Sequence, residues 1–185
     1  MSEKKHSKAY EAALCGISCA VAAGGLALGL LSGYFVATGY LIAITALMVP
    51  LSKKMYLGDF LAYIGTCILA VVLGAAVQFW DLVPFAIFFG LHPLVNALQL
   101  KFKINKWIAL PVKALWFDGM LIASYFIIFN GVFGGSVFPE EFYKTVNDYV
   151  YLFVFTLGTV IFVAYDFLIF RVQQTLNKII FRVIK

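Results

Sequence analysis

Long apolar runs that are almost free of charge are the feature that most constrains this chain. Between Lys8 and Lys53 the one charged residue is Glu11, and this stretch has room for two membrane-spanning helices. Of the 185 residues, 63% are hydrophobic and 12% are charged. A water-soluble domain of this size cannot hide so much apolar surface, because its surface is too large for its volume. The sequence therefore predicts an all-α integral membrane protein.

Six apolar runs predict six transmembrane helices in a single domain, 1–185. They lie at about 9–31, 34–50, 57–78, 82–99, 107–130 and 149–170. Pro50 is expected to end the second run. Pro84 and Pro111 are expected in the first turns of the fourth and fifth helices, where a missing N–H costs little. The first run is too long for a signal peptide, and the next run follows within a few residues.

Basic residues are concentrated on one side of the predicted spans. They are Lys4, Lys5, Lys8, Lys53, Lys54, Lys101, Lys103, Lys106, Arg171, Lys178, Arg182 and Lys185. The loops on the opposite side hold Asp81, Glu140, Glu141 and Asp148, with Lys144 as their cation. Because basic loops stay on the inner side, both termini are expected to be cytoplasmic. The net charge of +5 thus reflects topology and gives no reason to expect a nucleic-acid partner.

The last residues, 171–185, predict a basic amphipathic helix at the inner membrane surface. The apolar residues that recur at helical spacing are Val172, Leu176, Ile179, Ile180 and Val183, with the basic residues on the other side. Anionic headgroups would add about 1 kcal/mol per cation to its binding. Anchoring to membrane lipid is the expected role, and docking of a cytoplasmic partner is the alternative.

Small residues form a stripe along the first predicted helix. Ala12, Gly16, Ala20 and Gly24 follow one another at four-residue intervals. Such spacing makes a flat ridge that another helix can approach closely, which is a main mode of helix association in lipid. The ridge is explained either by packing inside the protein or by docking of an external protein.

The chain lacks the residue sets of the enzymes and metal proteins that we considered. His6 lies in the polar N-terminal tail, so a histidine cluster cannot form around His92. Cys15 and Cys19 share a helix face but have no third ligand, and they are expected to be small apolar fillers. Glu140-Glu141 lacks the partner residues of a membrane protease, and no phosphate-binding glycine loop is present. We expect no enzymatic activity, no metal and no cofactor.

Polar residues interrupt the fourth predicted span, in the stretch FFGLHPLVNALQLKFK. His92, Asn96 and Gln99 fall on one stripe, and Pro93 should kink the helix beside the histidine. Counted from the span ends at about 1.5 Å per residue, His92 and Asp118 lie at similar depth in the bilayer. Ionisable groups at that depth are expensive and face the interior or a cavity. The two are therefore predicted partners.

Aromatic residues continue this polar stripe outward and predict an outer cavity for a small molecule. The candidate binding residues are Phe85, Phe88, Phe89, His92, Asn96, Asp118, Tyr125, Asn147 and Tyr151. Aromatic walls with a few polar groups are the usual composition of such a site. The loop 129–148 is either a lid over this cavity or an ordinary connection. The alternative for His92 and Asp118 is a structural hydrogen bond that ties two helices together.

Two stretches carry a family resemblance, LGDFLAYIGTCILAVVLG (57–74) and FFGLHPLVNALQLKFKINKWIALPVKALWFD (88–118). With the six-span layout and the small-residue first helix, the chain resembles clostridial-type S components, the substrate-binding membrane subunits of bacterial energy-coupling factor (ECF) transporters. The resemblance implies a six-helix bundle in the bacterial cell membrane. It also implies capture of a vitamin-like nutrient from outside, and docking through Ala12, Gly16, Ala20 and Gly24 to a shared transmembrane coupling subunit driven by two cytoplasmic ATPases.

Two other classes of protein remain open from the sequence. One is a non-transporting membrane subunit that assembles or anchors a larger complex through the first helix and the basic C-terminal helix. The other is a lipid-handling membrane protein. The aromatic walls suit many ring-shaped molecules, so the sequence does not name the nutrient.

Overall fold

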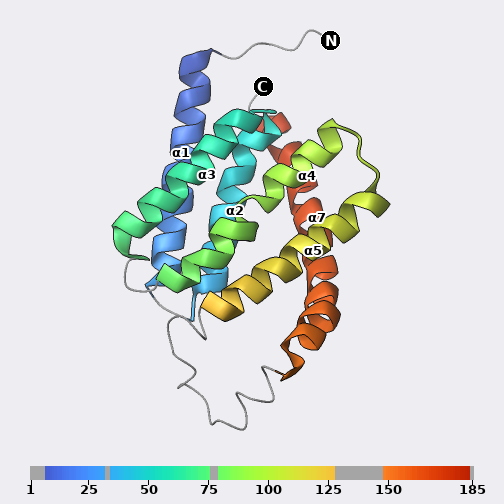
Figure 1. Cartoon of the computed structure of the whole chain (residues 1–185). Helices are drawn as coiled ribbons and strands as arrows, with labels where there is room; N and C mark the ends of the chain where they lie inside the picture. Colours follow the sequence, from blue (N-terminus) through green and yellow to red (C-terminus); the bar gives the residue numbers. More distant parts are fainter. Residues whose placement is uncertain (1–6, 32–33, 76–78, 128–147, 184–185) are drawn as a thin grey trace. The chain divides into compact units, whose positions relative to one another are not determined.

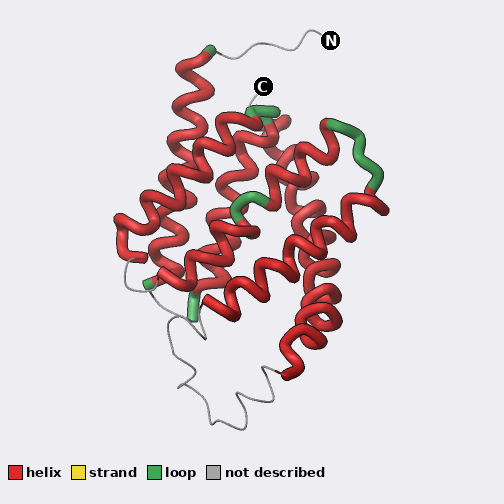
Figure 2. Tube along the Cα trace, viewed as in Figure 1, coloured by secondary structure: helices red, strands yellow, loops and turns green. Residues whose placement is uncertain are grey.

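Helices make up every regular element in the part of the chain that the structure describes (Figure 2). The structure is a computed structural model, and it describes residues 7–31, 34–75, 79–127 and 148–183. Within these ranges, five helices are long and apolar enough to cross a membrane, and a shorter apolar helix lies between the first two of them. This confirms the all-α class, and several helices have the length and apolar composition of membrane spans; the count of six spans and the orientation of the termini stay predictions.

The helix bounds follow the predicted spans closely (Figure 1). The α-helices are α1 (Lys8–Leu30), α2 (Val36–Ser52), α3 (Tyr56–Ala70), α4 (His92–Lys101), α5 (Lys106–Tyr125) and α7 (Thr159–Val183). The π-helices η1 (Val71–Ala75), η3 (Phe85–Phe89) and η5 (Val154–Gly158) and the 3₁₀-helix η2 (Phe79–Leu82) lie between or beside them. Residues 148–153 are also helical and lead into η5, so the last apolar helix runs over Asp148–Ile180.

Three details differ from the expectation. Pro50 lies inside α2, which continues to Ser52, so its expected place at the end of that helix is wrong. The Asn105 side chain caps α5 by accepting a hydrogen bond from the Trp107 N–H at 3.0 Å, so the helix begins at Lys106. Pro111 therefore lies in the helix interior, and its expected place in the first turn is wrong. At the C-terminal end, α7 continues without a break through Arg171, so the basic segment extends the last span.

The chain divides into two compact units. One comprises Met1–Phe102 and Ile169–Lys185, and the other comprises Lys103–Leu168. The continuous helix α7 contributes residues to both units. His92 belongs to the first unit and Asp118 to the second, so their predicted pairing stays a prediction.

The close packing of α1 against α2 forms the core of the first unit (Figure 1). A methyl group built on Gly29 would lie 2.7 Å from the Gly39 Cα, so the two backbones touch where these glycines meet. Around this contact the apolar side chains are almost fully buried: Ala22, Ala23, Leu26, Leu30, Ala43, Ile44, Leu47 and Met48. Close backbone approach at small residues is how helices associate in lipid, where no hydrophobic force draws them together.

The fourth span is interrupted beside the histidine, as Pro93 predicts. The π-helix η3 ends at Phe89, a turn follows at Gly90 and Leu91, and α4 begins at His92 with Pro93 in its first turn. Proline is tolerated in a first turn because the N–H that it lacks would have no helical partner there. The break places His92 at the N-terminal end of α4.

Candidate functional site

The small-residue ridge of α1 (Ala12, Gly16, Ala20 and Gly24) lies on an exposed face of the helix. Ala12, Gly16 and Ala20 are exposed, and Gly24 is half-buried. A methyl group built on Gly16 or Gly24 would meet no atom within 4 Å. The residues of the ridge therefore do not pack against other parts of the protein in this structure. This argues against internal packing, one of the two explanations for the stripe.

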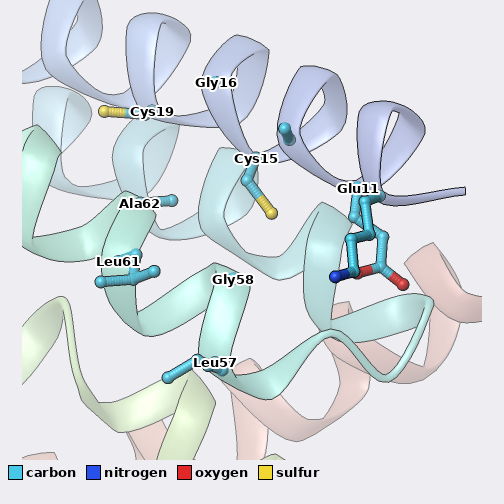
Figure 3. Close-up of a pocket in the computed structure, with 10 residues that line it drawn as sticks. Glu11, Cys15, Gly16, Cys19, Leu57, Gly58, Leu61 and Ala62 are labelled. Carbon is cyan, nitrogen blue, oxygen red and sulfur yellow. The ribbon is translucent and has the colours of Figure 1, made fainter.

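Other residues of α1 make its internal contacts. Gly25 and Gly29 face α2, and a methyl group on Gly25 would lie 2.5 Å from the Ile42 side chain. Cys15 and Cys19 face α3, close to Gly58 and Gly65 of that helix (Figure 3). The thiols thus fill space beside glycines, as expected for small apolar fillers, and all three cysteines are free.

A pocket of about 460 Å³ lies along the groove between α1 and α3 (Figure 3). Lys8 and Glu11 line it together with apolar residues, among them Leu57 and Leu61. Ala12 and Gly16 of the ridge also line it. The groove therefore suits apolar side chains from a neighbouring helix better than it suits a polar nutrient.

One aromatic ring packs against His92 in the first unit, and further rings continue the cluster from it. The His92 ring centroid lies 5.0 Å from that of Phe88, and Phe88 makes an edge-on contact with Phe89 at 5.4 Å. Tyr40 of α2 reaches the same cluster, with its ring 5.5 Å from Phe85 and 5.3 Å from Phe89. Such contacts are favourable beyond the apolar area that they bury. Three predicted binding residues, Phe85, Phe88 and Phe89, thus lie together near His92.

Two tyrosines hold the broken span by bonds to its backbone. The Tyr40 hydroxyl donates to the Asp81 carbonyl, and the Tyr63 hydroxyl donates to the Ala86 carbonyl. Carbonyl groups near a helix break lack their regular partners, and buried ones need another donor. Neither tyrosine was among the predicted site residues. Tyrosines on neighbouring spans at the depth of a predicted kink are a signal that would have found them.

The polar stripe of α4 faces the protein interior. His92 and Asn96 are 0% exposed and Gln99 is 7% exposed. This placement agrees with the expectation that polar groups in the fourth span avoid lipid. Because His92, Phe85 and Phe88 are fully buried, they pack against protein and do not line an open surface in this structure.

The remaining predicted binding residues are spread along the second unit. Asp118 is 1% exposed, and its Oδ2 lies 3.0 Å from the Thr159 hydroxyl. Tyr125 is half-buried, and Tyr151 is 52% exposed. Asn147 and the loop that was considered as a lid lie outside the described residues. The structure thus brings the aromatic part of the predicted site together around His92.

A buried ion pair in the second unit was missed by the sequence analysis. Lys113 Nζ of α5 lies 2.6 Å from Asp166 Oδ1 of α7, and the two side chains are 4% and 9% exposed. Asp59 of α3, 1% exposed, was missed as well. The signal was present, because each is an ionisable residue inside an apolar run and such residues face the interior.

The residues described here contain no group of three or more His, Cys, Asp or Glu side chains placed to hold a metal ion. Comparisons of the chain with protein-family models, with curated proteins and with solved structures found no match. The site is therefore interpreted from its own geometry.

Proposed function

We propose that the protein is the substrate-capture subunit of an ATP-driven nutrient uptake transporter in a bacterial cell membrane. It would bind a small vitamin-like or aromatic molecule from the outer side. It would then dock through α1 to a shared transmembrane coupling subunit, which two cytoplasmic ATPases energise. Both termini would be cytoplasmic.

The observation that supports this proposal most strongly is the exposed ridge of α1. The helix carries two sets of small residues, and the set formed by Gly25 and Gly29 is used for contact with α2. The ridge itself is left exposed. A flat surface of small residues in lipid favours contact with another helix over contact with acyl chains. The neighbouring groove beside α3 offers room for the side chains of such a helix.

The aromatic cluster around His92 supports the binding half of the proposal. Aromatic side chains with one or two polar groups bind flat, ring-shaped molecules well. His92 and Asn96 are buried in the first unit with these rings, and a polar group at membrane depth is a default candidate for function. A nutrient would have to displace packed side chains in order to enter, because Phe85 and Phe88 are fully buried.

Replacing Gly16 with leucine tests the docking surface. The larger side chain meets no neighbouring atom within 4 Å of its Cβ, so the isolated subunit should fold and melt as the wild type does. The same side chain should prevent close approach of a partner helix, and co-purification with the ATPases should fall at least tenfold. The measurement is affinity purification from cells of the natural host, followed by mass spectrometry of the partners.

Val21 offers a matched control on α1. It is 51% exposed and does not belong to the four-residue series of the ridge, so Val21→Ala should leave both folding and co-purification unchanged. If Gly16→Leu co-purifies with the same partners in the same amount as the wild type, the ridge is not the docking surface.

A second candidate function is a non-transporting subunit that assembles or anchors a larger complex. Full burial of His92, Phe85 and Phe88 favours it, since these residues pack as a core does. The exposed ridge serves this function equally well. The two candidates differ in their cargo: a capture subunit should co-purify with a water-soluble metabolite, and an assembly subunit should not.

A further inference from the structure

Around Asp118, in the second unit, the described residues supply more hydrogen-bond acceptors than donors. The Thr159 Oγ1 lies 3.0 Å from Asp118 Oδ2 and 2.9 Å from the Phe155 carbonyl oxygen. A hydroxyl group has one hydrogen, so it can donate to one of these two acceptors and not to both. No described residue donates a hydrogen bond to the other carboxylate oxygen, Oδ1.

Among the described residues of the second unit, the buried ion pair does not balance the charge of the Asp118 carboxylate. Lys113, on the same helix as Asp118, lies 2.6 Å from Asp166, and this contact pairs it with another carboxylate. Asp118 is 1% exposed, so water does not reach it from the surface. A buried carboxylate without a positive partner is very costly in a low-dielectric setting.

The backbone opposite Asp118 departs from a regular α-helix. Phe155 belongs to the π-helix η5 (Val154–Gly158), and π-helical turns occur often at functional sites. Gly158 ends this π-helix, and a methyl group on it would lie 3.1 Å from Asp118 Oδ1. The absence of a side chain at Gly158 therefore brings the backbone close to the carboxylate.

We infer that Asp118, Thr159 and the π-helix η5 form a sodium-ion site within the membrane. One carboxylate, one hydroxyl and a backbone carbonyl are hard oxygen ligands, and a single negative charge suits a monovalent ion better than Ca²⁺ or Mg²⁺. The ion would supply the positive charge that the oxygens lack. The inference goes beyond the proposed function, since it requires neither a nutrient nor a coupling subunit.

Thermal unfolding of the purified full-length protein in detergent, in sodium chloride and in choline chloride of equal ionic strength, tests the site. Sodium at about a hundred times its Kd should raise Tm by about 5 °C or more. Asp118→Asn should fold, because the amide supplies the missing hydrogens, and its Tm should not respond to sodium. Thr159→Val should fold, and it should need at least tenfold more sodium than the wild type for the same rise in Tm.

Thr156→Val is the matched control, because Thr156 lies on the same π-helix, is exposed, and its hydroxyl bonds the Leu152 carbonyl. It should keep the full response to sodium. A wild-type Tm that is equal in both salts would overturn the inference, as would a sodium response that survives in Asp118→Asn. If acid alone raises Tm and sodium does not, a proton on Asp118 supplies the missing hydrogen, and the sodium site is excluded.

Discussion

Replacing Lys113 with methionine should lower the free energy of unfolding by about 3–5 kcal/mol, because it removes the cation beside the buried Asp166 carboxylate. The Nζ–Oδ1 distance is 2.6 Å and both side chains are nearly inaccessible, so water does not compensate for the loss. Methionine fills a volume similar to the lysine stem, and the expected loss therefore comes from the charge and not from a cavity.

A second substitution separates the charge effect from packing. In Lys113→Met/Asp166→Leu neither charge remains, and the double variant should recover most of the lost stability. Unfolding can be followed by titration with a denaturing detergent. Lys106→Met is the control on the same helix: Lys106 is exposed, its Nζ lies 5.4 Å from the Trp107 ring centroid, and the change should cost no more than about 1 kcal/mol. A Lys113→Met protein as stable as the wild type would show that the pair contributes nothing.

Replacing Gly29 with alanine should also destabilise the protein strongly, by about 3 kcal/mol. The added methyl group would lie 2.7 Å from the Gly39 Cα and 3.0 Å from the Phe35 carbonyl oxygen. Both are backbone atoms, which cannot rotate away as a side chain can. The helices α1 and α2 would have to separate, and the core between them would lose its close packing.

Gly16→Ala provides the comparison for this prediction. Gly16 lies on the same helix, and a methyl group there meets nothing within 4 Å. Alanine favours helix over glycine, so this variant should be as stable as the wild type or up to about 1 kcal/mol more stable. Both variants are measured by the same detergent titration. Equal stability of Gly29→Ala and Gly16→Ala would contradict the assignment of two different faces to α1.

The positions of the helices could be predicted because charged residues bracket the apolar runs. The first span, predicted at 9–31, is observed as Lys8–Leu30, and the second, predicted at 34–50, as Val36–Ser52. The start of the fifth span, predicted at 107, is observed at Lys106, where the Asn105 side chain accepts a hydrogen bond from the Trp107 N–H. Such local bonds shift a helix end without changing the hydrophobic pattern.

The faces of α1 could not be assigned from the sequence. Gly16 and Gly24 belong to one set of small residues at four-residue spacing, and Gly25 and Gly29 belong to another. Both sets consist of small residues at four-residue spacing, so both predict close helix contact. Which set contacts α2 depends on the rotation of α1 about its axis. That rotation is determined by packing with the rest of the first unit.

The candidate binding residues were predictable in part. A polar stripe in an apolar run must face inward, and His92 and Asn96 do so. Their partners could not be predicted, because depth alone does not specify which helices are neighbours. The same limit explains why Lys113 and Asp166 were missed, since they are 53 residues apart in the sequence.

Native mass spectrometry of the gently purified protein tests the central claim, capture of a nutrient, most directly. A capture subunit should carry one water-soluble metabolite per chain. In His92→Ala the amount of bound metabolite should fall at least tenfold while the variant still folds. Phe102→Ala is the control, because Phe102 is 65% exposed and lies outside the aromatic cluster, and it should retain the metabolite. A wild-type protein that carries no metabolite, or that carries lipid alone, would contradict the claim.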